Sequence, residues 1–262
     1  MTKIHPEALA AWDSADERAR RAVLAHAVAR ARRAYDEEER GGQASKWCPP
    51  TVETTEVIEA RLAPHLIATL VTSHRVYHYA QSGSDWSTQT VVISEVSYDG
   101  LVSERIVYAR AFNVSEGDSD DHDDAVAVQE QIEYWRDAIR RAVEHVRKHV
   151  AESVHLHSGG WPITHVFEPD ITVLEVGQRD GSIVVTTCTS IRIDLAAQAG
   201  SDYAKRVVEI DETTVFYSRL ATRTVVERND QRGEYEDFDS KEFEREAIDA
   251  WRARYHDRKP DS

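Results

Sequence analysis

Apolar residues recur at steps of three and four along four stretches of this chain, and alternate with polar residues in the stretches between them. Steps of three and four predict amphipathic helices. We expect a short helix over residues 6–12, opened by Pro6, and a longer one over 16–37. A third is expected over 124–152. The fourth follows Asp239, and its apolar stripe is Phe243, Ala247, Ile248, Trp251 and Tyr255.

The alternating stretches predict strands bounded by turn residues. The first group is expected over 51–61, 66–81, 87–98 and 102–113. The second group is expected over 163–167, 170–177, 182–197, 203–211 and 213–227. Because short turns join successive strands, they predict antiparallel meanders and not parallel strands with helical crossovers. The expected fold class is α+β, in the order helices, sheet, helix, sheet, helix.

The chain also repeats itself. The run TSHRVYHYAQSGSDW at 72–86 returns as TSIRIDLAAQAGSDY at 189–203, with eight of fifteen positions identical at a constant offset of 117. An internal period of this length predicts two tandem units related by a pseudo-two-fold arrangement. We expect a first unit over 1–123 and a second over 124–262, with the helix at about 124–152 shared between them.

Three of the expected helices carry an aliphatic residue three positions before a tryptophan. The pairs are Leu9 with Trp12, Ile132 with Trp135, and Ile248 with Trp251. This shared spacing places each pair on one helix face. We therefore expect the three tryptophans to be buried in equivalent settings against the two sheets.

The net charge of −15 argues against nucleic acid as a partner, because affinity for a phosphate backbone is built from clustered lysine and arginine. No basic leader and no apolar run of membrane length is found, so we expect a cytoplasmic protein without a membrane partner. Glycine-rich phosphate loops and paired CxxC motifs are absent from the sequence, and we expect no cofactor.

The clearest candidate site lies on the long second strand. Thr72, His74 and His78 share one face, which is the more apolar face in both repeats. The second repeat carries Ile191 and Leu195 where the first carries the two histidines. Buried imidazoles need polar partners, water or a ligand. Two interpretations stay open: hydrogen-bonded buried histidines, or a ligand site of Thr72, His74, His78 and Trp86.

Histidines also gather around the end of the middle helix. His145 and His149 are four residues apart, which places both rings on one helix face, while His155 and His157 share a face if their segment is extended. His165 follows nearby. The spacing permits a metal ion, but no HExxH motif is formed. A solvated helix face followed by a histidine-rich connector is the expected structure, with no metal.

The end of the chain resembles SnoaL-like domains of the nuclear-transport-factor-2-like, cystatin-type α+β class. The resemblance is carried by VVEID at 207–211, the strand after it, an acidic loop and the helix that ends in WRARY at 251–255. It implies a sheet wrapped by helices. The family includes cyclases, isomerases and dehydratases as well as non-catalytic binding modules, so the resemblance does not choose a reaction.

Two functions are therefore expected. The first is a non-catalytic binding or assembly protein of two duplicated units that acts through a partner protein or a small ligand, as a monomeric pseudo-dimer or a homo-oligomer. The alternative is a SnoaL-like small-molecule enzyme with its pocket around His74 and His78.

Overall fold

The structure is a computed structural model that describes residues 2–40, 51–62, 64–78, 86–115, 124–196, 203–217, 221–234 and 240–256. It is an α+β protein with two five-stranded sheets and four helices in these residues, and neither sheet closes into a barrel there. The chain divides into two compact units, Met1–Trp135 and Arg136–Ser262. The division falls inside helix α3 (Asp124–His157), so this helix contributes residues to both units.

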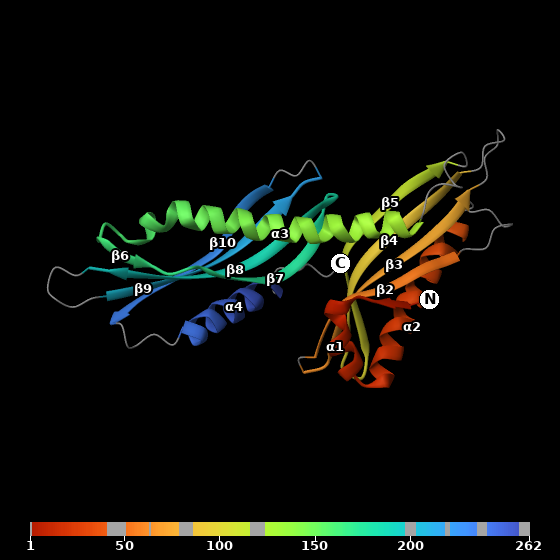
Figure 1. Ribbon diagram of the computed structural model, residues 1–262, viewed down its shortest axis with the longest axis horizontal. Helices are drawn as coiled ribbons and strands as arrows, with labels where there is room; N and C mark the ends of the chain where they lie inside the picture. Colours follow the sequence, from red (N-terminus) through yellow and green to blue (C-terminus); the bar gives the residue numbers. More distant parts are fainter. Residues whose placement is uncertain are drawn as a thin grey trace. The chain divides into compact units, whose positions relative to one another are not determined.

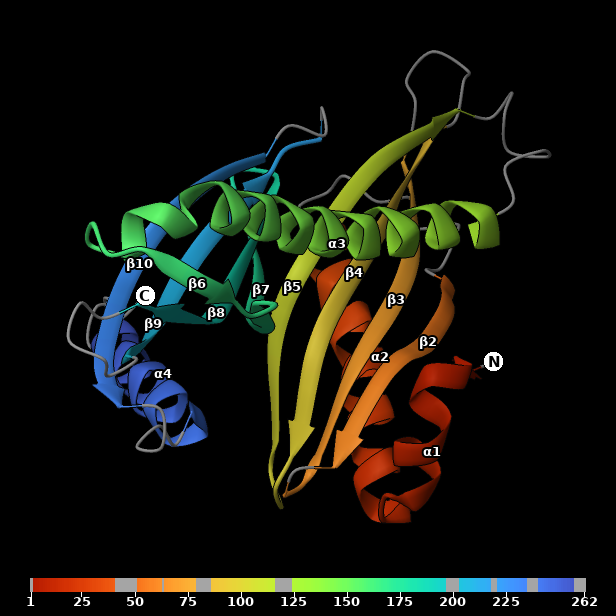
Figure 2. The same cartoon turned by 60° about the vertical axis from the view of Figure 1, so that its left-hand side comes forward.

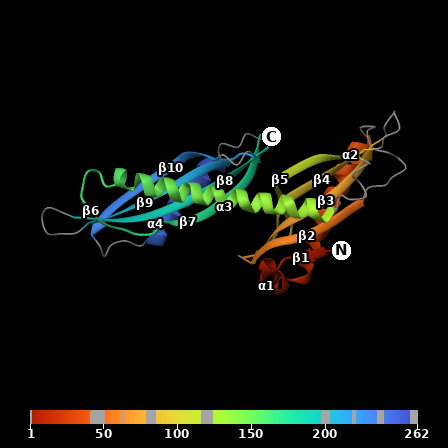
Figure 3. The ribbon, with the colours of Figure 1, turned by 45° about the horizontal axis from the view of Figure 1, so that its top comes forward.

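The first unit contains one mixed sheet. Its elements are β1 (Thr2–Ile4), α1 (Pro6–Ser14), α2 (Glu17–Arg40), β2 (Thr51–Leu62), β3 (Leu66–His78), β4 (Trp86–Tyr98) and β5 (Val102–Ser115). The strands follow the order β1-β2-β3-β4-β5, and β2 to β5 form the antiparallel meander that the sequence predicts. Strand β1 was not expected. It pairs in parallel with β2, beside which it lies in Figure 3.

Both faces of this first sheet are covered. On one face, Trp12 of α1 and Val23 of α2 pack against Leu66 and Leu70 of β3. On the other, the beginning of α3 lies over the sheet, where Tyr108 Oη donates a 2.8 Å hydrogen bond to Gln131 Oε1. Figure 2 shows α1 and α2 on one side of these strands and α3 on the other. The helices before the sheet and the helix after it therefore occupy opposite faces.

The second unit contains the other sheet. After α3 come β6 (Ile163–Val166), β7 (Asp170–Arg179), β8 (Ser182–Leu195), β9 (Tyr203–Val215), β10 (Ala221–Glu234) and α4 (Ser240–His256). Strands β10, β9 and β8 are antiparallel neighbours. Both β6 and β7 pair with β8, at different ends of it.

Helices cover both faces of this sheet too. Val146 and Val150 of α3 pack against Ile191, Ile193 and Leu195 on one face. Ala247 and Trp251 of α4 pack against a second set on the other face, Cys188, Val208 and Ile210. In Figure 1, β8 and β9 lie between α3 and α4. The face of Ile191, which the sequence indicates as the more apolar one, thus lies under the preceding helix.

Two expected boundaries are wrong. The break expected at Glu212 does not exist, because β9 continues to Val215. The run of polar residues there suggests a turn, yet Asp211 and Thr213 are buried strand residues on the same face. Helix α3 also continues past 152 to His157, so His155 and His157 are helical and do not share a face in an extended segment.

The three tryptophans are all buried: Trp12 and Trp135 are 3 % exposed and Trp251 is 8 % exposed. Their settings are not equivalent, however. Trp12 packs on the face of its sheet that lies under the helices before the sheet, and this face carries Leu70. Trp251 packs on the face that lies under the helix after its sheet, and this face carries Cys188. The reason is topological, since α1 precedes its sheet and α4 follows its sheet.

Within the described part of the chain, none of the helices is long and apolar enough to cross a membrane.

Candidate functional site

The predicted site residues on β3 lie beneath α2. Thr72 is completely buried and accepts a hydrogen bond from Arg30 of α2. His74 is 2 % exposed, and neither ring nitrogen has a hydrogen-bond partner in the described structure. Burial, and then the nearby charge of Arg30, lowers the pKa of His74, so the imidazole is neutral at pH 7. His78 and Trp86 lie opposite each other in the β3–β4 register, but their side chains are outside the described residues.

An ion-pair network lies beside Thr72. Arg30 Nε is 2.8 Å from Glu104 Oε1, and His26 Nε2 is 3.1 Å from Glu104 Oε2. The two helix residues therefore fix the carboxylate of a strand residue on the face that carries His74. This arrangement makes the Thr72–His74 region a polar part of an otherwise apolar interface.

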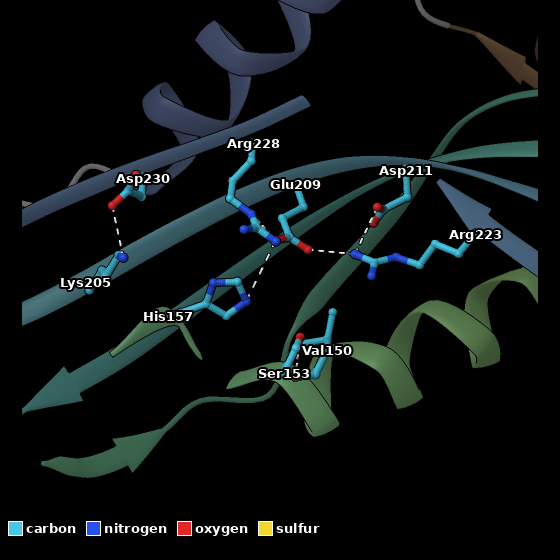
Figure 4. A network of polar contacts seen from close by, with 9 residues as sticks. All are labelled: Val150, Ser153, His157, Lys205, Glu209, Asp211, Arg223, Arg228 and Asp230. Carbon is cyan, nitrogen blue, oxygen red and sulfur yellow. Dashed lines mark hydrogen bonds and ion pairs between the residues drawn. The ribbon is translucent and has the colours of Figure 1, made fainter. Parts of the chain in front are cut away.

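The second unit carries a larger polar cluster on the sheet face that lies under the preceding helix, as His74 does in the first unit. This face is under the second half of α3 (Figure 4). We call this group the polar cluster; it consists of His157, Glu209, Asp211, Arg223 and Arg228. Glu209 and Asp211 are completely buried. Arg223 Nη2 lies 2.7 Å from Glu209 Oε2 and 2.9 Å from Asp211 Oδ1. Arg228 lies 2.5 Å from Glu209 Oε1. Two buried carboxylates are thus balanced by two guanidinium groups.

A β-bulge brings the two arginines together. Arg223 pairs with Thr213 and Arg228 with Glu209, with a register shift between Val225 and Glu227. Residues five apart on a regular strand point to opposite faces, and one extra residue reverses this alternation. Both guanidinium groups therefore reach the face of Glu209.

Several polar atoms around the polar cluster lack partners in the described structure. They are the hydroxyls of Thr187, Thr189 and Thr213, and His157 Nε2, which lies 3.8 Å from Glu209 Oε1. Burial raises the pKa of Asp211 to about 6 and lowers the pKa of His157. Buried polar atoms without partners mark places for ordered water or a small polar ligand.

The polar cluster has a signal in the sequence, although none of the predicted sites includes it. Glu209, Asp211 and Thr213 alternate with Val208 and Ile210, so three successive positions on one face of the strand are polar. Such a run, next to the apolar Val208 and Ile210 on the other face, could have indicated buried charges before the fold was known.

An open pocket of about 610 Å³ lies on the other face of the second sheet, beneath α4. We call it the α4 pocket. The strands and the β6–β7 connection contribute Phe167, Glu168, Asp170, Ser190, Arg192 and Arg206; α4 contributes Lys241, Glu244, Arg245, Ile248, Asp249 and Arg252. Five cationic and four anionic side chains line it. This location was not predicted.

Two arginines form the floor of the α4 pocket. Arg192 of β8 and Arg206 of β9 lie directly opposite each other in the strand register. Arg206 donates a 3.0 Å hydrogen bond to Ser190 Oγ. Arg192 donates a 3.2 Å hydrogen bond to Asp194 and stacks on Phe167, with 4.9 Å from its guanidinium carbon to the ring centroid.

A carboxylate also contributes to the electrostatics of the pocket. Burial, and then the neighbouring charge of Asp170, raises the pKa of Glu244, while Arg206 and Lys241 oppose the shift. Glu244 therefore takes up a proton more readily than an exposed glutamate, which makes the pocket more positive as the pH falls.

The first unit has the same polar contact at the corresponding sequence positions. Gln89 Nε2 donates a 3.1 Å hydrogen bond to Ser73 Oγ, and Gln89 and Ser73 stand 117 residues before Arg206 and Ser190. Arg75 stands 117 residues before Arg192 and lies opposite Gln89. In the first unit all three residues are buried. The second unit has an open pocket at the corresponding place.

The histidines near the end of α3 do not come together as one group. His145 and His149 form an edge-to-face pair with centroids 5.0 Å apart, and His165 packs in the same way on Phe167. His155 is exposed, while His157 belongs to the polar cluster. Among the residues described, no group of three or more metal-ligating side chains is found.

Compared with protein-family models, with curated proteins and with solved structures, the chain shows no match. The resemblance to SnoaL-like domains therefore remains a prediction.

Proposed function

We propose that this chain is a non-catalytic binding protein built from two duplicated α+β units, and that the second unit binds a small ligand in the α4 pocket. The observation that carries the proposal is the pocket itself. Its volume of about 610 Å³ falls within the range of small-molecule sites. It also brings polar groups from two strands and a helix together around one space.

Duplication is supported by matched contacts as well as by the repeated sequence. The serine at the corresponding position of each unit accepts a hydrogen bond from its cross-strand neighbour, Gln89 in one unit and Arg206 in the other. Each sheet also has its preceding helix on one face and its following helix on the other. After duplication, one copy can keep a packed interior while the other changes residues to bind a ligand.

A binding role is favoured over catalysis by the chemistry of the lining. The residues that line the α4 pocket include no cysteine or histidine. Ser190 Oγ accepts a hydrogen bond from Arg206, whereas a nucleophilic serine donates its proton to a general base. Cys188, on the same sheet face, is buried, and burial raises its pKa to about 12. A thiol that stays protonated is a poor nucleophile.

The proposal is tested by NMR titration of the labelled protein with a panel of neutral, cationic and anionic fragments. Binding fragments should shift the amide signals of Ser190, Arg192 and Ile248. In Asp249→Trp, a large ring on the exposed α4 side of the pocket lining should weaken these shifts, whereas Asp13→Trp on α1 should not. A panel in which no fragment shifts the pocket signals contradicts the proposal.

The SnoaL-like enzyme remains a second candidate because of His74, whose neutral and buried imidazole lacks a hydrogen-bond partner in the described structure. A polar group in that state is a place where a ligand gains a hydrogen bond. In the same titration, this candidate predicts shifts at Thr72 and His74, and none at Ser190.

A further inference from the structure

Two arginines oppose each other at the floor of the α4 pocket. Arg192 and Arg206 are register partners on β8 and β9, where side chains on one face stand about 5 Å apart at Cβ. Like charges at such positions repel and destabilise the strand pair. Asp194, 3.2 Å from Arg192, offsets part of this repulsion. An anion beside both guanidinium groups relieves it further, because guanidinium groups bind carboxylate and phosphate oxygens in a forked geometry.

We propose that the ligand of the α4 pocket carries an anionic group, carboxylate or phosphate, that binds Arg192 and Arg206. The inference rests on the proposed function and names the chemistry of its ligand. Lys241, Arg245 and Arg252 of α4 add three further cationic side chains to the same space.

The charge of the pocket differs from that of the chain. The sequence has 47 acidic and 32 basic residues, yet the pocket is lined by five basic and four acidic ones. Two of the basic residues have acidic partners: Arg252 is 3.7 Å from Asp249, and Arg192 is 3.2 Å from Asp194 beside the pocket, while Arg206, Lys241 and Arg245 add further positive charge to the lining. A concentration of cationic side chains within an acidic protein favours anions at this pocket, since the rest of the surface repels them.

Both arginines are held in place by neighbouring groups. Ser190 Oγ accepts from Arg206, and the stack on Phe167 together with Asp194 orients Arg192. Such preorganisation lowers the entropy cost of binding. Phe167 and Ile248 supply apolar surface at the same pocket, which suits an anion attached to a flat apolar body.

The first unit indicates which substitution removes the charge of Arg206 without disturbing the fold. Gln89 occupies the position of Arg206 and makes the same hydrogen bond to its serine, so a glutamine there is compatible with the fold. Arg206→Gln should therefore keep the hydrogen bond to Ser190 and the melting temperature while it removes one of the two opposed charges. A loss of binding in this variant reports on the charge.

The experiment compares benzoate, benzylphosphonate, benzylamine and benzyl alcohol by NMR titration at constant ionic strength. The two anions should shift the signals of Ser190 and Arg192, and Arg206→Gln should weaken their affinity by about tenfold or more. Arg140→Gln, on the exposed surface of α3, is the control and should bind as wild type does.

The outcomes separate the two proposals. If benzylamine or benzyl alcohol binds the pocket as well as the anions do, the inference is overturned while the proposed function stands. The inference also fails if Arg206→Gln folds normally and keeps full anion affinity. If no compound shifts the pocket signals, both proposals fail.

Discussion

Arg223 and Asp211 form an ion pair of 2.9 Å in the interior of the second unit, where the Asp211 side chain has no exposed surface. Charges removed from water in this way are stabilised only as long as their partners remain. The pair therefore makes the second unit sensitive both to substitution and to pH.

Replacing Arg223 with methionine should destabilise the protein by roughly 3–5 kcal/mol, because Glu209 and Asp211 are then left buried without this guanidinium. Urea unfolding at pH 7 measures the change. Arg21→Met is the control. Arg21 pairs with Glu17 on the exposed surface of α2, and its loss should cost less than about 1 kcal/mol. Equal effects of the two substitutions would contradict the role of the buried network.

Asp211→Asn should change how stability depends on pH. Burial raises the pKa of Asp211 from 3.8 to about 6, so between these values the folded protein keeps a proton that the unfolded chain releases. The stability from this group is fully present below about pH 4 and is lost as the pH rises through 6.

The asparagine variant lacks this loss. Relative to wild type, its free energy of unfolding should rise between pH 4 and pH 7 by up to roughly 3 kcal/mol. Urea unfolding at four pH values measures the difference, with exposed Asp13→Asn as control. Parallel profiles for Asp211→Asn and wild type would show that the Asp211 carboxyl titrates normally.

Trp135→Ala should lower the free energy of unfolding by about 3–5 kcal/mol, since the ring is 3 % exposed and its removal leaves a cavity. Thermal melting followed by circular dichroism measures the effect. Leu156 of α3, which is 70 % exposed, provides the comparison, and Leu156→Ala should stay within about 0.5 kcal/mol of wild type. A wild-type melting temperature for Trp135→Ala would show that the helix does not depend on this residue.

His74→Ile should be at least as stable as wild type at pH 7, because it replaces a buried imidazole by the apolar residue found at Ile191 of the second unit. It should also resist acid better. The lowered pKa of His74 means that the folded protein loses stability as the pH falls below 6.5, where the unfolded histidine takes up a proton.

Melting curves at pH 7 and pH 5 test both statements for His74, with His149→Ile on the exposed face of α3 as control. Clear destabilisation of His74→Ile at pH 7 would mean that the imidazole makes contacts that the fold needs.

Much of the fold was accessible from the sequence. The 117-residue offset and the alternation around Thr72 and Thr189 predicted the strands, the α+β class and the more apolar face of β3 and β8, which is buried under helices. These features depend on local periodicity, and periodicity is visible in a single chain. The parallel strand β1 was missed because three residues are too few to show a period.

The sites depended on contacts between distant segments. The α4 pocket joins β8, β9 and a helix more than thirty residues further along the chain, and no local pattern places Arg245 near Arg192. The sequence directed attention to His74, because the second repeat has the apolar Ile191 at the same position. The structure instead has the open pocket and the larger set of buried charges in the second unit.

The polar cluster shows most clearly why the sequence alone does not determine which charged residues meet. From the alternation alone, Glu209 and Asp211 share a face, but Arg223 and Arg228, five residues apart, should point to opposite sides. One bulge residue between Val225 and Glu227 reverses the alternation and puts both guanidinium groups on the side of Glu209. The sequence determined which residues alternate, while the position of the bulge, and so the pairing of the buried charges, was decided by the tertiary packing of β10 against β9.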